Sequence, residues 1–173
     1  RNPQGLYYSQ KHDDIFSTEH GPNGGDEINY NKYPDLSEIE NYGWPISSYG
    51  GHYGVSSYKR IADKLQIVEE RDEWPYAVEP LYKKHKKYGF IEPLLNFAPS
   101  VGISQIVEVN KNFLNNGAYR NFAFGTMGYA TTEFIPSLSI FLISINKENI
   151  ITSENQLVIN ERIRDLIFNA QNN

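Results

Sequence analysis

The stretch Leu138-Ser139-Ile140-Phe141-Leu142-Ile143-Ser144-Ile145 decides the fold class of this chain. It is the longest apolar run in the sequence, and two serines interrupt it. Its length and its isoleucine content are typical of a β-strand. The run is far shorter than the ~20 apolar residues that a membrane-spanning helix needs. We therefore expect a strand over 138–145 and no membrane span.

Similar signals recur along the chain. Runs rich in aromatic or β-branched residues predict strands at 5–8, 14–18, 28–31, 103–109 and 121–124, and alternation over 157–167 predicts another. Gly and Pro make residues 21–25 a loop. Apolar residues over 58–71 are spaced three and four apart, so this segment is expected to be helical or irregular. This pattern predicts an all-β protein (a propeller, a barrel or a sandwich) whose loops carry the chemistry.

Composition and net charge exclude several classes of function. The 173 residues suffice for one domain with a core, and the net charge of −5 argues against nucleic-acid binding. The basic run at 83–87 is interpreted as a solvated surface segment. Absence of cysteine excludes disulfides and thiolate metal sites. The chain opens on Arg1 without an initiator Met, so its N-terminus is expected to be cut.

Four segments carry a family resemblance. They are Arg1-Asn2-Pro3-Gln4-Gly5-Leu6, then residues 18–29 (Thr-Glu-His-Gly-Pro-Asn-Gly-Gly-Asp-Glu-Ile-Asn), Asn41-Tyr42-Gly43-Trp44-Pro45, and Glu161-Arg162-Ile163-Arg164-Asp165. In this order and spacing they resemble the glucose/sorbosone dehydrogenase family, the soluble aldose sugar dehydrogenases that use pyrroloquinoline quinone (PQQ). The resemblance implies a six-bladed β-propeller with cofactor, calcium and sugar on loops at the top of its channel.

The matching segments fall in the second half of the family domain. Residues 1–173 are therefore expected to form a partial propeller of roughly half the blades, with long loops. Missing blades would leave open sheet edges. The chain would cover these edges by rearrangement, by partial closure or by forming a homodimer.

The resemblance also implies a cofactor site. Arg1 would be catalytic, facing with Asn2 the quinone oxygen that gains negative charge. Arg162 and Arg164 would bind carboxylates of PQQ, since residues two apart on a strand share a face and guanidinium groups pair with carboxylates. The alternative for these two arginines is an exposed strand face with scattered charge.

Two calcium sites follow from the same resemblance. Backbone carbonyls of Gly21 and Pro22 would hold the catalytic calcium, because Ca²⁺ prefers oxygen ligands. Glu27 and Tyr42 would contribute to a second, structural calcium. Asp26 and Glu27 are not interpreted as an acid/base pair, because adjacent strand residues face opposite ways.

Two departures from the family pattern bear on the site. No lysine occurs between Lys111 and Lys147, whereas the family often has a quinone-contacting lysine after the strand that 121–127 matches. Leu94 and Leu95 stand where the family usually has aromatic residues that wall the sugar pocket. These changes leave the identity of the sugar open and weaken the expectation of cofactor binding.

Two functions are therefore considered. The first is part of an enzyme that oxidises the anomeric carbon of an aldose sugar, with PQQ and calcium as cofactors. In the family the catalytic base is a histidine upstream of Arg1, so His20 is interpreted as a loop residue and the chain alone is expected to be inactive. The second is a non-catalytic propeller binding module. The electron acceptor stays open, and the resemblance implies a periplasmic or secreted protein.

Overall fold

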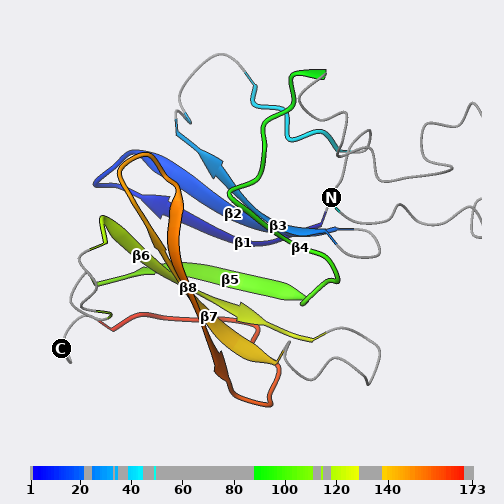
Figure 1. Ribbon diagram of the computed structural model, residues 1–173, viewed down its shortest axis with the longest axis vertical. Helices are drawn as coiled ribbons and strands as arrows, with labels where there is room; N and C mark the ends of the chain where they lie inside the picture. The colour runs from blue at the N-terminus through cyan, green and yellow to red at the C-terminus, as the bar shows by residue number, and fades with distance from the viewer. Residues whose placement is uncertain are drawn as a thin grey trace, which may run out of the picture.

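The computed structural model describes residues 2–21, 25–32, 34, 39–44, 49, 88–110, 114, 118–128 and 138–169. Within these ranges the chain folds into strands that form two layers (Figure 1). The segment 58–71, expected to be helical or irregular, and the basic run at 83–87 lie outside them. The strands are β1 (Asn2–Ser9), β2 (Asp14–His20), β3 (Asp26–Asn31), β4 (Leu95–Phe97), β5 (Ile103–Val109), β6 (Arg120–Thr126), β7 (Ser139–Ile145) and β8 (Ile151–Val158).

The strands form two four-stranded antiparallel sheets in simple meander order, β1-β2-β3-β4 and β5-β6-β7-β8. Each strand pairs with the next one in the chain, as Phe16 with Tyr30 and Phe124 with Phe141 illustrate. β3 and β4 are far apart in the sequence but pair directly, with Asp26 opposite Phe97. The all-β prediction is confirmed.

Most of the expected strands are present. The strand at 103–109 matches in both bounds, and the strand expected at 138–145 begins one residue later. The strand expected over 157–167 is wrong in place: β8 ends at Val158, and residues 159–169 form no strand. The alternation there has another cause. Ile163 and Leu166 are half-buried, while the residues beside them are exposed, without a neighbouring strand to pair with.

The core lies where the two sheets pack face to face. Phe16 of the first sheet meets Phe122 of the second with ring centroids 4.3 Å apart, and Phe97 lies 5.4 Å from Phe141. Buried isoleucines of both sheets surround these rings. Every residue of β6 is buried, since one face of this strand packs on the first sheet and Ile163 lies against the other at Gly125. This packing fixes the sheets relative to each other. Among the described residues no helix is long and apolar enough to cross a membrane.

Candidate functional site

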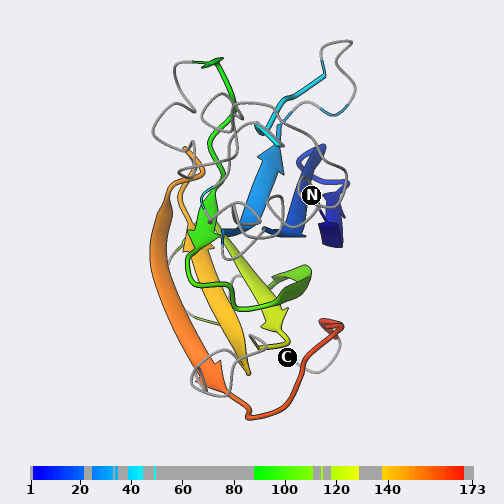
Figure 2. The ribbon, with the colours of Figure 1, turned by 90° about the vertical axis from the view of Figure 1, so that its right-hand side faces the viewer.

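The two sheets share their ends. At one end of the sheets β2 and β6 finish and β3 and β5 begin, and we call this the Gly21 end. Figure 2 views the molecule from the side where β1 starts. At the other, the Arg120 end, β6 begins and the β1–β2 and β7–β8 turns lie. Among the described residues that carry the family resemblance, Asn2, Gly21, Asp26 and Ile163 lie at the Gly21 end, whereas the Tyr42 hydroxyl bonds to the carbonyl of Tyr30, further along β3.

The carboxylate of Asp26 organises the Gly21 end. Its Oδ2 accepts hydrogen bonds from the backbone nitrogens of Val101 (3.0 Å), Gly102 (2.7 Å) and Ile103 (3.2 Å). Its Oδ1 accepts one from the nitrogen of Gly21 (3.1 Å) and another from the Ser100 hydroxyl. Asp26 is fully buried. One side chain therefore ties the Gly21 turn to the connection between the sheets.

Ser104 makes a second tie at the same end. Its carbonyl accepts a 2.6 Å hydrogen bond from Thr18 Oγ1 of β2, and its own hydroxyl donates a 2.6 Å bond to the carbonyl of Ile163. The nitrogen of Ile163 bonds in turn to the carbonyl of Thr126 at 3.1 Å. Gly125 permits this approach, because a Cβ there would lie 2.5 Å from Ile163 Cγ2. Ile163 is thus held by both its side chain and its backbone.

The expected cofactor residues lie around these ties. Asn2 is exposed and pairs across the ladder with His20, next to Gly21. Arg162 and Arg164 are exposed and flank the half-buried Ile163. They are not on a strand, which corrects that part of the expectation, although both remain on the outward side of the segment. Arg1 and Pro22 lie outside the described residues.

Three of the expected calcium residues, Gly21, Glu27 and Tyr42, lie within the described part of the chain. The amide of Gly21 is bound to Asp26, as described above. Glu27 is fully buried, with its Oε2 3.4 Å from Asn29 Nδ2. The Tyr42 hydroxyl bonds to the Tyr30 carbonyl and to Glu40, and burial followed by this bond to Glu40 raises the pKa of Tyr42. No cluster of three or more acidic or histidine side chains suited to a metal occurs in the part of the chain with described placement.

The departures from the family pattern have structural counterparts. Leu94 and Leu95 pack against the hydrophobic core. Met127 and Gly128, which follow β6, donate backbone hydrogen bonds to the carbonyls of Gly102 and Val101. His20 is the last residue of β2 rather than a loop residue, and its Nε2 lies 2.7 Å from the Ile103 carbonyl.

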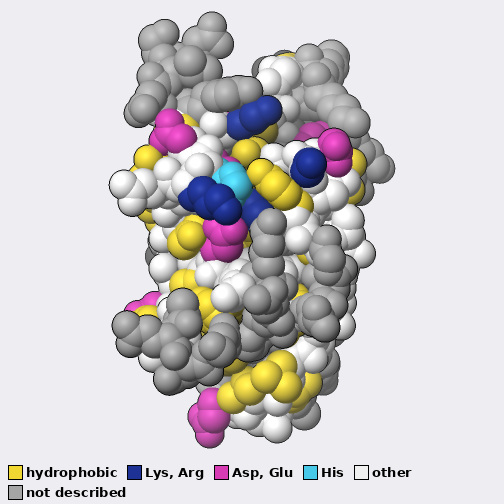
Figure 3. Space-filling model, turned by 90° about the vertical axis from the view of Figure 1, so that its left-hand side faces the viewer, with side chains coloured by type: hydrophobic (Ala, Val, Ile, Leu, Met, Phe, Trp, Pro, Cys, Tyr) yellow, Lys and Arg dark blue, Asp and Glu magenta, His cyan; other side chains and the backbone are white. Residues whose placement is uncertain are grey.

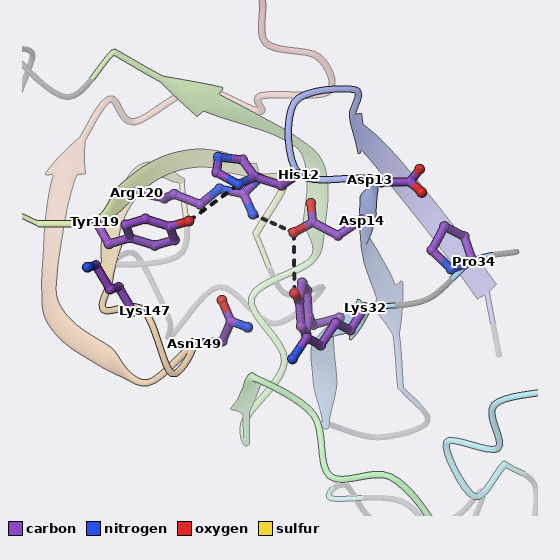
Figure 4. A pocket seen from close by; sticks show the side chains of 10 residues that line it. His12, Asp13, Asp14, Lys32, Pro34, Tyr119, Arg120, Lys147 and Asn149 are labelled. Atoms are coloured by element: carbon purple, nitrogen blue, oxygen red, sulfur yellow. Dashed lines mark hydrogen bonds and ion pairs between the residues drawn. The ribbon is translucent and has the colours of Figure 1, made fainter. Parts of the chain in front are cut away.

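Sequence reasoning missed the ion-pair cluster at the Arg120 end. Arg120 is only 2% exposed, and its guanidinium bonds to Asp14 at 2.6 Å and, through two nitrogens, to Glu108 at 3.0 and 2.9 Å. Figure 4 shows the bond between Arg120 and Asp14. Tyr30 donates a 3.3 Å bond to the same Asp14 oxygen. These bonds offset the cost of burying the charges. An arginine directly before the run Asn-Phe-Ala-Phe was the signal that could have revealed it.

Comparison with known proteins finds similarity to sugar dehydrogenases. The family model Glucose / Sorbosone dehydrogenase matches residues 1–80. Over these residues, which are less than half of the chain, it is similar to the glucose/sorbosone dehydrogenase family. Among curated proteins similar to this chain, the aldose sugar dehydrogenase YliI of Escherichia coli is 40% identical over 68 residues, which are 39% of this chain and 16% of that protein. Quinoprotein glucose dehydrogenase B of Acinetobacter calcoaceticus is 27% identical over 172 residues, which are 97% of this chain and 32% of that protein.

A solved structure shows the same fold. The soluble aldose sugar dehydrogenase of Escherichia coli, in its apo-form, superposes on this chain with a TM-score of 0.58 at 22% identity, over 95% of this chain and 38% of that one. The two sheets of this chain are therefore blades of a partial β-propeller. The chain spans about a third of the length of the Acinetobacter calcoaceticus glucose dehydrogenase and of the Escherichia coli aldose sugar dehydrogenase in the solved structure.

Proposed function

We propose that this chain is part of a quinoprotein oxidoreductase that oxidises the anomeric carbon of aldose sugars by hydride transfer to calcium-bound PQQ. The relationship to aldose and glucose dehydrogenases supports sugar oxidation in general. The cofactor, the metal and the residues that hold them are the proposed part. On this proposal residues 1–173 form part of one glucose/sorbosone dehydrogenase-like β-propeller domain.

The observation that carries the proposal is that Arg162 and Arg164 are exposed on a segment that is anchored between them. Both side chains are exposed, and neither makes an ion pair with another described residue. The residue between them is anchored through Ser104 and Thr126. Two permanently charged guanidinium groups on an anchored segment suit a ligand with several carboxylates, and PQQ has three.

The donor sets at the Gly21 end fit both cofactors. Backbone carbonyl oxygens of Gly21 and Pro22 are hard donors of the kind calcium prefers, and Asp26 already holds the amide of Gly21. When bound, PQQ would accept the hydride and calcium would polarise its carbonyl. Arg162 and Arg164 would bind its carboxylates, and Arg1 and Asn2 would orient it and stabilise developing negative charge. Glu27 and Tyr42 are proposed to contribute to a second calcium.

The remaining parts of the proposal concern partners. The substrate is an aldose sugar, the electron acceptor is left open, and the protein acts in the periplasm or outside the cell. A homodimer through open sheet edges is one way to cover β4 or β8. A purely non-catalytic binding module is not favoured, because the named relatives are dehydrogenases.

A titration tests the proposal. The chain, checked for folding by circular dichroism, is titrated with PQQ in the presence of calcium and in the presence of a chelator, and binding is followed by absorbance and calorimetry. We expect saturable binding that requires calcium. A folded chain that binds PQQ equally well without calcium, or fails to bind it with calcium, would contradict the proposal.

A further inference from the structure

A cavity of about 420 Å³ opens between the two sheets at the Arg120 end, away from the proposed cofactor site. Figure 3 shows this face, where basic side chains and a histidine gather, and Figure 4 shows the cavity from close by. Its size lies in the range of small-molecule sites. The residues that line it come from both sheets: His12, Asp13, Asp14, Tyr30, Lys32, Pro34, Tyr119, Arg120, Lys147 and Asn149.

The interior of the cavity is built from buried charge. Arg120 and Asp14 are each 2% exposed and are joined by the 2.6 Å ion pair. Asp14 Oδ1 is buried and accepts no hydrogen bond from any described residue. Because a buried carboxylate oxygen without a donor is costly, this atom favours a ligand or water that supplies one. Three of the five N–H donors of Arg120 are used by Asp14 and Glu108.

The rim of the cavity adds positive charge and aromatic walls. Lys147 and Lys32 lie on either side of Asn149 (Figure 4). Lys147 is exposed and makes no ion pair within the described part of the chain. Tyr30 and Tyr119 form apolar walls from opposite sheets, and Tyr119 is held against His12 with a ring separation of 5.6 Å. The lining residues carry three permanent positive charges against two carboxylates.

We propose that this cavity is a second ligand site, which takes a small hydroxylated anion such as a sugar acid or a sugar phosphate. Lys147 and Lys32 would bind the carboxylate or phosphate. Asp14 would accept hydrogen bonds from hydroxyl groups of the ligand, and Asn149 would donate hydrogen bonds to them. The tyrosine rings would pack on the carbon skeleton. The site is independent of the proposed function, because none of its residues belongs to the Gly21 end.

Binding of three probes of similar size tests the proposal. The chain, without PQQ or calcium, is titrated calorimetrically with gluconate, glucose 6-phosphate and glucose. We expect at least one anion to bind at least about tenfold more tightly than glucose, and added NaCl to weaken it. Binding of gluconate alone identifies a carboxylate site, and binding of glucose 6-phosphate alone identifies a phosphate site. Failure of both anions to bind, or equal binding of glucose, overturns the proposal.

Two lysine variants locate the binding. Lys147→Gln should weaken binding of the anion about tenfold, because it removes a charged donor from the rim of the cavity. Lys11→Gln is the matched control: it removes the same charge from the neighbouring β1–β2 turn, but Lys11 does not line the cavity. Both lysines are exposed, so both variants should fold. Equal weakening by the two variants would show non-specific attraction and would overturn the assignment.

Discussion

The carboxylate of Asp26 accepts a 2.7 Å hydrogen bond from the backbone nitrogen of Gly102, a residue 76 positions further along the chain. Around the same carboxylate, the nitrogens of Gly21, Val101 and Ile103 also donate. The bonds join the loop after β2 to the connection between the two sheets. A buried side chain that makes so many bonds fixes the surface on which the proposed cofactor residues lie.

The first prediction concerns this carboxylate. Asp26→Asn keeps the size but replaces one acceptor oxygen by an NH₂ group that faces backbone donors. We expect the free energy of unfolding to fall by about 2–4 kcal/mol, measured by urea denaturation. Asp165→Asn is the control, because Asp165 is exposed, and it should change the stability by less than about 0.5 kcal/mol. Equal midpoints for the two variants would show that the Asp26 bonds contribute little.

A second prediction uses two glycines with positive φ. Gly102 (φ 65°) and Gly89 (φ 69°) have the same backbone strain if replaced, but a Cβ on Gly102 would lie 2.7 Å from the Gly128 carbonyl oxygen, whereas one on Gly89 meets nothing within 4 Å. Gly89→Ala should cost about 1–2 kcal/mol from backbone strain alone. Gly102→Ala should cost measurably more in the same thermal unfolding assay. A similar loss in both would remove the steric argument.

The third prediction addresses the anchor of the arginine-bearing segment. A Cβ on Gly125 would lie 2.5 Å from Ile163 Cγ2 and 2.7 Å from Ser104 Oγ. Gly125→Ala should therefore displace residues 162–164, lower the melting temperature and weaken PQQ binding. Adding Ile163→Ala removes the closest clashing atom and should restore part of the stability. If the double variant is no more stable than the sum of the single effects predicts, the two residues are not coupled.

The fourth prediction concerns the ion pairs at the Arg120 end. Arg120→Met leaves Asp14 and Glu108 without their partner, and removal of one member of a buried pair typically costs about 3–5 kcal/mol. It also removes a guanidinium that lies 4.9 Å from the centre of the Phe16 ring. Arg164→Met, at an exposed site, is the control for denaturant unfolding and should stay within about 0.5 kcal/mol of the unmodified chain.

The fifth prediction is a loss of stability at alkaline pH. Burial raises the pKa of Tyr30, and the neighbouring charge of Asp14 raises it further, against the lowering effects of Asn149 and Arg120. An unfolded tyrosine ionises near pH 10. Above that pH the unfolded chain loses a proton that the folded chain keeps, so the stability present below about pH 10 is lost as the pH rises.

Denaturant unfolding between pH 8 and 11 measures this effect. Tyr30→Phe should flatten the decline, while Tyr88→Phe, at an exposed position, should leave it unchanged. A decline of the same slope in all three proteins would show that other groups cause it. Burial, followed by Glu108, raises the pKa of Tyr7 in the same direction, so Tyr7→Phe should act like Tyr30→Phe.

The sequence predicted the strands whose apolar residues are buried. It did not predict the strands that lack such a pattern and form only because they pair with a neighbouring strand. β5 and β7 carry strong apolar patterns and were located almost to the residue. β4 has only three residues, and its strand character comes from pairing with β3. The polar stretch Thr152–Gln156 of β8 is an exposed outer strand without a core-facing pattern, so no periodicity indicated it.

The candidate site was predictable only through its motifs. Asn2, Gly21, Arg162 and Arg164 were chosen from short sequence matches, and the fold brings Asn2 beside His20 and holds Ile163 between the arginines. The roles of Asp26 and Ser104 could not be foreseen, because their partners lie about 60–85 residues away and depend on how the sheets pack. Arg120 was hidden for the same reason, since its partner Asp14 is in the other sheet.

The central claim is that the arginines beside Ile163 bind the carboxylates of PQQ. It is tested most directly by titrating three proteins with PQQ in the presence of calcium: the unmodified chain, the double variant Arg162→Gln/Arg164→Gln, and the control Lys11→Gln/Lys147→Gln, which makes the same charge change at the Arg120 end. The proposal predicts that the arginine variant binds at least about a hundredfold more weakly, while the lysine variant binds like the unmodified chain. Equal affinity in all three proteins would contradict it.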